Sequence, residues 1–451
     1  MQKTVAKLEE MSVEFVDLKL SDLAGKLHHI TFPLSRLAKA IKTGIGFDGS
    51  SLGGFRGVQE SDLIVRPDTS NIVIDPFYER STVTFFGDIY EPDGKTPFAG
   101  CPRNILKKTL EHIRASGIAD KIIVLPEFEF HIFDEVEFFA EPTQSGYVVT
   151  TGEEGLADSL KNAYHISNPL DTTANLRSDI AAIIADAGID VKYHHHEVGP
   201  HSQVEIEADF MDVSRAGDSI QLIKYIVKNR VAGEGLFATF MPKPLAGQAG
   251  NGMHLHIQLW KGEKNVFASA SDENELSETA LSFLGGIIKH ARALCAFTNP
   301  STNSYKRLMG GMEAPKQVFH SRANRKAAVR IPGYVRGAKD LRFEYRVPDA
   351  MANPYLAVAG ILLAGLDGVE NKLNPGPLIP DEPKPSDKKF PVLPHDLSQA
   401  IRSLAQDSGF LTRDDIFPKD VVKKWIKEKE KEIEEISSYP TPAEYIKYFA
   451  I

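Results

Sequence analysis

The sequence predicts an α+β protein with a small strand-rich N-terminal domain, residues 1–102, followed by a larger mixed domain, residues 103–451. Two observations lead to this prediction. In the N-terminal part, several short runs alternate between apolar and polar residues, as strands with one buried face do. Beyond it, helix-length periodic segments alternate with strand-like runs that carry charged residues.

The N-terminal domain is expected to begin with a helix and to continue as strands. Residues 1–11 mix charged and apolar side chains in the pattern of an amphipathic helix rather than a signal peptide. Residues 14–20 and 26–32 predict a hairpin, because an Asp-Leu-Ala-Gly stretch lies between two alternating runs. Further strands are predicted at residues 72–77 and 82–90.

A glycine-rich segment, residues 47–55, interrupts this domain. Its sequence, Phe-Asp-Gly-Ser-Ser-Leu-Gly-Gly-Phe, is too rich in glycine for a regular element. It lacks the lysine and the spacing of a phosphate-binding P-loop. Taken alone, it is interpreted as a surface turn.

The larger domain alternates helices and strands. Helices are predicted at residues 103–116, 178–187 and 214–231, and strands at residues 121–133, 190–197, 203–209 and 252–260. Residues 134–175 are irregular and are interpreted as a long loop. The apolar run at residues 355–366 is too short to cross a bilayer and predicts a buried helix. The Lys/Glu-rich residues 421–436 predict a solvated helix.

Composition narrows the class of protein. A net charge of −9 and a pI near 5.9 argue against nucleic acid or an anionic membrane as the main partner. Cys101 and Cys295 lie far apart without zinc-site spacing, so we expect two free thiols in a reducing compartment. These features favour a cytoplasmic protein.

The most informative stretch is the predicted strand at residues 122–133. Glu127 and Glu129 are two residues apart, so a strand directs both carboxylates to the same face. Two adjacent carboxylates in an apolar strand repel each other and resist desolvation unless a cation or arginines neutralise them. An edge strand with a solvated polar face is the alternative interpretation of this pattern alone.

Three further groups repeat this combination of charge and strand pattern. Glu197 follows a run of three histidines, and Glu205 and Glu207 follow shortly after. His254 and His256 lie in a glycine-rich stretch, and Glu344 is flanked by arginines two residues away on each side. The many acids and the lack of cysteine ligands favour oxygen ligands and a hard cation over zinc.

Together, these residues suffice for two cation sites of the Mg²⁺ or Mn²⁺ type. Paired hard cations indicate phosphate chemistry or hydrolysis. Six arginines in one third of the chain favour phosphate or carboxylate ligands, although a basic surface patch is the alternative. They are Arg307, Arg325, Arg330, Arg336, Arg342 and Arg346.

The chain resembles the type I glutamine synthetases of bacteria and archaea over nearly its full length. The resemblance is carried by ordered motifs at residues 47–51 with 60–62, 127–130, 195–205, 241–256, 299–315, 321–332 and 342–349. Asn-Pro-Ser-Thr-Asn-Ser-Tyr-Lys-Arg at residues 299–307 is the most specific. The resemblance implies a β-grasp-like N-terminal domain and a catalytic domain with a curved antiparallel sheet flanked by helices.

The resemblance also implies a role for each matching residue. One metal site would be formed by Glu129, Glu197 and Glu205, and the other by Glu127, His254 and Glu344. Glutamate would be bound by Arg307, Gly250, His254 and Arg346. ATP would be bound by His256, Arg325, Arg330, Lys339 and Arg342, with Arg325 and Arg346 also neutralising the phosphoryl group during transfer.

For ammonium, the resemblance implies binding and deprotonation by Asp48, with help from Ser51, Tyr164 and Glu197, and closure of the site by Glu313. In the family Asp48 comes from a neighbouring subunit, in a dodecamer of two hexameric rings. The implied reaction joins ammonia to the γ-carboxylate of glutamate through a γ-glutamyl phosphate. Small regulatory proteins are possible further partners. A γ-glutamyl-polyamine or amine ligase and a non-catalytic sensor are the alternatives.

Three departures from the family pattern bear on substrate and regulation. Ala249 stands where many members have Asn, which removes a usual contact to glutamate and keeps an amine acceptor open. No tyrosine lies between Tyr355 and Tyr439, where adenylylated members carry the modified residue, so we predict no adenylylation. Gly57 stands where the feedback-regulated subgroup has Arg, with Arg56 one residue early.

Overall fold

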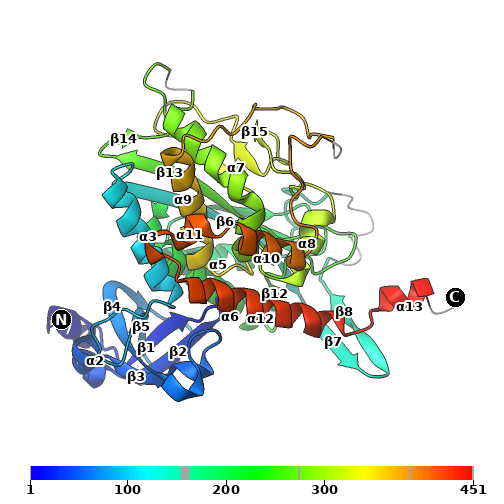
Figure 1. The fold of residues 1–451 in the computed structure, drawn as a ribbon. Helices are drawn as coiled ribbons and strands as arrows, with labels where there is room; N and C mark the ends of the chain where they lie inside the picture. Colours follow the sequence, from blue (N-terminus) through cyan, green and yellow to red (C-terminus); the bar gives the residue numbers. More distant parts are fainter. Residues whose placement is uncertain (1, 154–161, 273–274, 385–386, 449–451) are drawn as a thin grey trace.

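The computed structural model describes residues 2–153, 162–272, 275–384 and 387–448 (Figure 1). It begins with α1 (Gln2–Glu10), as predicted, and a sheet with strand order β2-β1-β5-β4-β3. In this sheet β1 and β5 are parallel, and the other neighbours are antiparallel. Its elements are β1 (Phe15–Ser21), β2 (Leu27–Pro33), α2 (Leu37–Thr43), β3 (Ile45–Asp48), β4 (Asp62–Ile74) and β5 (Thr82–Tyr90).

The predicted hairpin is confirmed as β1 and β2, whereas the strand predicted at residues 72–77 is longer than expected. It begins at Asp62, because Leu63, Val65 and Pro67 are buried in alternation with less buried neighbours. The glycine-rich segment contributes the end of β3 and a short 3₁₀ turn, Gly49–Ser51. The interpretation of this segment as wholly irregular was therefore wrong at its first two residues.

A larger sheet has β6 (Lys121–Phe133) at its centre. Its order is β15-β16-β17-β13-β6-β10-β9, and its neighbours are antiparallel except for the parallel pair β15 and β16. These strands are β9 (Val191–His196), β10 (Gln203–Ala208), β13 (Met253–Lys261), β15 (His320–Arg322), β16 (Val329–Ile331) and β17 (Phe343–Tyr345). Short strands extend it: β11 (Met211–Asp212), β12 (Phe237–Thr239) and β14 (Lys264–Asn265). The four strands predicted from charged runs all belong to this sheet.

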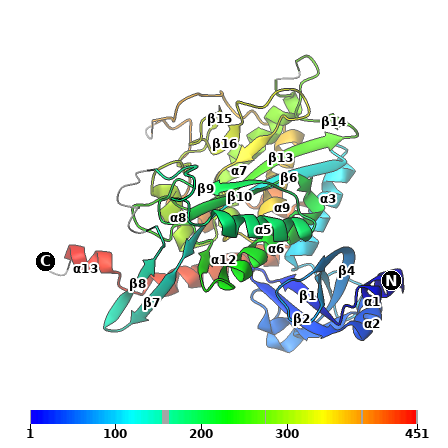
Figure 2. The ribbon, with the colours of Figure 1, turned by 180° about the vertical axis from the view of Figure 1, so that it is seen from behind.

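Helices cover the larger sheet, and α7 and α9 lie in front of β13 and β6 in Figure 1 and behind them in Figure 2. The helices are α3 (Pro102–Ser116), α5 (Ala174–Asp186), α6 (Val213–Ala232), α7 (Glu278–Thr298), α8 (Thr302–Met309), α9 (Pro354–Glu370), α10 (Leu397–Gln406), α11 (Gly409–Thr412), α12 (Lys419–Ser437) and α13 (Pro442–Tyr448). Gly286 lets α7 and α9 approach closely, since a Cβ there would lie 1.9 Å from the carbonyl oxygen of Ala364.

The buried-helix prediction for residues 355–366 is confirmed by α9, whose residues from Pro354 to Gly368 are all buried. Among the described residues, one helix, α7, is long and apolar enough to cross a membrane, and 72% of its apolar window is buried inside the protein. Burial in a packed protein core removes an apolar helix from water, as insertion into lipid would. Both cysteines are free and buried, as predicted.

Arg103 at the start of α3 joins the N-terminal sheet to helix α6 of the larger domain. Its guanidinium contacts Asp68 at 2.7 Å and Asp88, which lie on β4 and β5, and Asp218 of α6 at 2.8 Å. Arg103 is only 9% exposed. A buried guanidinium with several carboxylate partners holds the elements that supply them in one arrangement.

Two predictions for the larger domain were wrong. The segment 134–175, interpreted as a loop, contains an antiparallel hairpin, β7 (Glu135–Glu141) and β8 (Gln144–Thr150), which projects from the body beside α13 in both views (Figures 1 and 2). Residues 154–161 of that segment lie outside the described residues. The helix predicted to be solvated, α12, buries one face, on which Trp425 donates a hydrogen bond to the carbonyl oxygen of Ala296 at 2.9 Å.

Candidate active site

The site is built on two rows of side chains that cross neighbouring strands. In the first row, His195 of β9, Glu205 of β10 and Glu129 of β6 are directly opposite one another. The second row is Tyr193, Glu207, Glu127 and His254 of β13. Residues two apart on a strand face the same side, so both rows lie on one face of the sheet. Like charges directly opposite each other are destabilising, and each row contains such a pair.

Glu197, His256 and Glu344 join the side chains of these rows in three groups. Within each group the ligand atoms lie within 4.8 Å of one another. The groups are Glu127, His254 and Glu344; His195, Glu197 and Glu205; and Glu127, Glu207 and His256. The first contains the three residues expected for one metal site. In the second, Glu197 and Glu205 lie together as expected, and Glu129 lies opposite Glu205. Carboxylate and imidazole donors in this number fit a hard divalent cation.

The electrostatics of the first row favour a cation. Burial raises the pKa of Glu197 and Glu205 well above the usual range of a glutamate, and neighbouring carboxylates, including Glu129, raise both further. Glu197 accepts a hydrogen bond from the backbone N–H of Val198 at 2.6 Å. Carboxylates that are difficult to ionise in the empty site are stabilised in their charged form by a bound cation.

Histidine and arginine side chains of the protein itself stabilise the negative charge of Glu127, in the second row, and of the neighbouring Glu344. Burial alone would raise the pKa of Glu127, but His256 at 2.7 Å and His254 at 2.9 Å hold it well below its usual range. Burial likewise opposes ionisation of Glu344, yet Arg346 and Arg330 contact its two oxygens and its pKa is lowered to about 2. Both carboxylates are therefore ionised at neutral pH.

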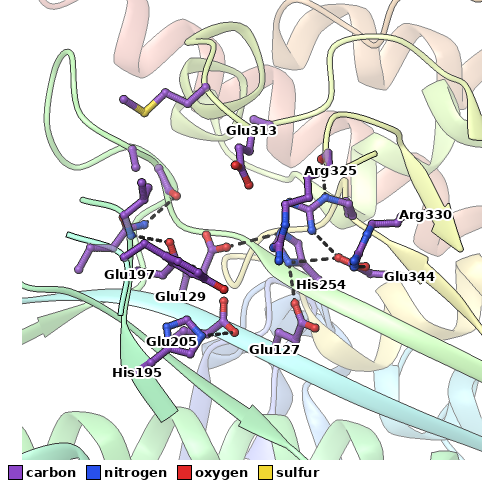
Figure 3. Close-up of a pocket in the computed structure, with 18 of the residues that line it drawn as sticks. Glu127, Glu129, His195, Glu197, Glu205, His254, Glu313, Arg325, Arg330 and Glu344 are labelled. Atoms are coloured by element: carbon purple, nitrogen blue, oxygen red, sulfur yellow. Dashed lines mark hydrogen bonds and ion pairs between the residues drawn. The ribbon is translucent and has the colours of Figure 1, made fainter. Parts of the chain in front are cut away.

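Apart from Glu207 and His256, these side chains line one cavity of about 350 Å³. Figure 3 shows Glu129, Glu197 and Glu205 on one side of it, Arg330 and Glu344 on the other, and Glu313 above. The arginines that line it are Arg307, Arg325, Arg330 and Arg346. A cavity with carboxylates on one wall and guanidinium groups on another can bind divalent cations together with anionic substrates.

Arg307 is anchored from the protein side. Its guanidinium donates to the carbonyl oxygens of Val347 at 2.8 Å and Arg346 at 3.1 Å, and it is 4% exposed. Gly252 packs against it, because a Cβ there would lie 2.5 Å from the guanidinium. The head group is thus held in one orientation before any ligand binds.

Two family models match the chain. The model for the glutamine synthetase catalytic domain matches residues 99–448, and the model for the glutamine synthetase beta-Grasp domain matches residues 12–92. The chain belongs to the glutamine synthetase family. The predicted fold, a β-grasp domain followed by a catalytic domain with an antiparallel sheet and flanking helices, is confirmed.

Relatives of this glutamine synthetase chain match over their whole length. Glutamine synthetase of Azospirillum brasilense is 40% identical, over 98% of this chain and 98% of the relative, and that of Rhizobium meliloti (strain 1021) is 39% identical, over 100% and 99%. Among solved structures, Plasmodium falciparum glutamine synthetase aligns with a TM-score of 0.89 at 28% identity, over 98% of both chains. The structure of apo GmaS without ligand aligns with a TM-score of 0.85 at 28% identity, over 100% of both chains.

Several residues that the resemblance implicates lie at the cavity of this glutamine synthetase chain. Gly250, Tyr164 and Glu313 line it. Burial of Tyr164 raises its pKa, and Arg325 beside it opposes that shift. Tyr164 and Glu313 are exposed, whereas Gly250 is half-buried.

Other implicated residues do not line the cavity in a single chain. Asp48 and Ser51 are exposed on the first sheet, where Ser51 donates to Asp48 at 2.9 Å, and hydrogen bonds from Ser50 and Ser51 lower the pKa of Asp48. Lys339 is also exposed. Arg342 is buried behind His256, to whose Nδ1 it donates at 3.2 Å.

Sequence reasoning missed residues that support the site. Glu207 received no role, although its position two residues after Glu205 places it on the same face. Lys192, which pairs with Glu207, also lines the cavity. Glu153 is buried and accepts hydrogen bonds from His196 at 3.0 Å and from the backbone of Ser202 at 2.7 Å. No sequence pattern indicated Glu153, because its partners are distant along the chain.

Proposed function

We propose that this protein is an ATP-dependent glutamate–ammonia ligase that forms glutamine, ADP and phosphate through a γ-glutamyl phosphate. The observation that supports the proposal most strongly is a cavity in which two clusters of carboxylate side chains face several arginines. The chain that contains it belongs to the glutamine synthetase family. Phosphoryl transfer requires this combination, because negative charge accumulates on the transferred group and its neighbours.

Two divalent cations, Mg²⁺ or Mn²⁺, would be held by Glu129, Glu197 and Glu205 and by Glu127, His254 and Glu344. The fit rests on the donor set and on the raised pKa values of Glu197 and Glu205, since a cation relieves the repulsion among buried carboxylates. When bound, such cations neutralise phosphate oxygens and orient the nucleotide.

The side chains on the opposite wall would bind the substrates. Arg307 and Arg346, with Gly250 and His254, would hold glutamate, and the prior anchoring of Arg307 reduces the ordering that binding requires. Arg325 and Arg346 would stabilise the phosphoryl group during transfer. ATP would contact His256, Arg325 and Arg330, with Lys339 and Arg342 as further ligands.

The acyl phosphate must be protected from water until ammonia attacks it. Glu313, exposed at the opening of the cavity, would close it. Asp48 would take a proton from ammonium, together with Ser51, Tyr164 and Glu197. Since Asp48 lies away from the cavity of its own chain, we propose that it serves the cavity of a neighbouring copy.

This arrangement requires an assembly, which we propose to be a dodecamer of two hexameric rings in the cytoplasm. We also propose that the domain boundary lies between residues 102 and 103, at the start of α3, and that the enzyme is not adenylylated. Small regulatory proteins are proposed as further partners of the assembly.

The test is product formation by the purified full-length protein. ATP, Mg²⁺ and glutamate are supplied with ammonium or with a panel of amines, phosphate release is measured, and the product is identified by mass. We expect ammonium-dependent glutamine. Phosphate release only with an amine would replace the proposal with a γ-glutamyl-amine ligase, and no release with any acceptor would replace it with a non-catalytic sensor.

A further inference from the structure

The third carboxylate–histidine group of the site, formed by Glu127, Glu207 and His256, differs from the group of His195, Glu197 and Glu205. Glu207 is directly opposite Glu127 on β6 and opposite Tyr193 on β9, and it is only 1% exposed. One of its oxygens, Oε2, has no hydrogen-bond partner among the described residues. By geometry alone this group resembles a cation site, with its ligand atoms within 4.8 Å of one another.

Protein donors already occupy this group. Arg342 donates from Nε to Nδ1 of His256 at 3.2 Å, so Nδ1 is an acceptor and the proton of the neutral ring is on Nε2. Nε2 then donates to Glu127 at 2.7 Å and offers no lone pair to a metal. The remaining carboxylate, Glu207, is paired through Oε1 with the ammonium group of Lys192.

The group that contains Glu197 and Glu205 has no such internal cation. In the part of the chain that the structure describes, the ion pairs of Glu197 and Glu205 include neither a lysine nor an arginine, and His195 at 3.3 Å is the basic neighbour of Glu205. These two carboxylates are left for an external cation, whereas Glu207 is not. Glu207 is therefore paired with Lys192, whereas Glu205, two residues earlier on the same strand, has no lysine or arginine partner among the described ion pairs.

We propose that Lys192 is a built-in counter-ion of the active site. By pairing with Glu207 it takes the place that a third protein-held divalent cation would fill, and its charge lowers the affinity of the neighbouring site at Glu127 for external cations. Its side chain reaches this position from β9, and it is 31% exposed at the wall of the cavity. The inference rests on the proposed function, because it assumes that the bound cations are the divalent cations of an ATP-dependent ligase.

Charge balance predicts opposite effects for the two partners. Lys192→Met leaves Glu207 as an uncompensated anion beside Glu127, so divalent cations should bind about tenfold more tightly at the site that contains Glu127. Glu207→Gln leaves an unpaired ammonium group, so binding should weaken by about tenfold. The double variant removes one charge of each sign and should bind within about twofold of the wild type. Lys192→Arg keeps the charge and should resemble the wild type.

The experiment is a titration of the metal-free full-length protein with Mn²⁺, without nucleotide, followed by electron paramagnetic resonance and calorimetry. Lys261→Met is the matched control, because Lys261 ends β13 and donates to the carbonyl oxygen of Gly117 away from the cavity. We expect tighter Mn²⁺ binding for Lys192→Met, and no change for Lys261→Met.

Unchanged or weaker Mn²⁺ binding by Lys192→Met, or an equal change in Lys261→Met, would overturn the proposal. If Lys192→Met does not fold, Glu207→Gln decides: weaker binding supports the proposal, and unchanged or tighter binding overturns it. Glutamine formation by the wild type is measured separately. If the Mn²⁺ affinities follow the expected pattern while no glutamine forms, the counter-ion stands and the proposed reaction fails.

Discussion

Replacing Arg103 with Met tests how strongly the N-terminal sheet is held to helix α6 of the larger domain. The substitution keeps most of the aliphatic stem but removes a cation that contacts Asp68, Asp88 and Asp218. Removing one partner of a buried ion-pair network leaves the remaining charges uncompensated, at a cost of about 3–5 kcal/mol. Lys107, which contacts Asp88 at 2.6 Å, would compensate only part of this charge.

The pKa of Asp68 gives a second measure of the same contact. Burial alone would raise this pKa, but hydrogen bonds from Arg103 and Ser70 lower it from 3.8 to about 2. The difference corresponds to about 2.4 kcal/mol of stability, since one pKa unit is about 1.36 kcal/mol. We therefore expect Arg103→Met to lower the free energy of unfolding by about 2–5 kcal/mol at pH 7.

The loss should also depend on pH. Because the folded-state pKa of Asp68 lies below its unfolded value, its contribution is complete above pH 4 and is lost as the pH falls towards 2. The difference in the free energy of unfolding between the wild type and Arg103→Met should therefore decrease as the pH falls from 4 towards 2. Urea unfolding at fixed protein concentration, followed by circular dichroism from pH 7 downwards, measures it.

Arg80→Met is the control for Arg103→Met, because Arg80 pairs with Glu14 at 3.0 Å on the surface, with the two side chains 73% and 46% exposed. Exposed pairs contribute about 0–1 kcal/mol. A loss in Arg103→Met no larger than in Arg80→Met, or one that does not change with pH, would refute the reasoning.

Three further outcomes are expected. Glu129→Ala should abolish glutamine formation, measured as ammonium-dependent product; retained turnover would remove Glu129 from the proposed metal site. Asp48→Asn should also be inactive, yet mixed assemblies of Asp48→Asn and Glu129→Ala should recover part of the activity if Asp48 serves a neighbouring copy, whereas failure to recover would place its role within one chain. Trp425→Ala should lower the free energy of unfolding by about 3–5 kcal/mol, because a buried indole and its bond to Ala296 are lost; a urea midpoint equal to the wild type would contradict this.

Local patterns were sufficient for much of the fold and for the carboxylates of the site. The alternation around Glu127 and Glu129 predicted both the central strand and the face that carries the charges, because burial of one strand face leaves a period of two in the sequence. The pairing of Lys192 with Glu207 could not be predicted in this way. It depends on the register between β9 and β10, which is set by contacts distant along the chain.

The failures have physical causes of the same kind. The hairpin β7–β8 has exposed apolar residues, with Phe138 82% and Tyr147 54% exposed, so no buried face marks it in the sequence. In α12 the buried stripe that includes Val421 and Trp425 is present but is outnumbered by Lys and Glu. The position of Asp48 relative to a cavity is not a property of one chain, if a neighbouring copy supplies it.

Because β6 carries one carboxylate of each cation group, the backbone repeat sets the distance between the two groups. Glu127 and Glu129 are two residues apart, which in a strand separates their Cα atoms by about 6.7 Å. Changes of side-chain rotamer leave the Cα separation unchanged, and a change of register would turn both carboxylates to the opposite face. The central strand therefore fixes the spacing of the two proposed cation sites, and we expect that spacing to change only if the sheet itself is disrupted.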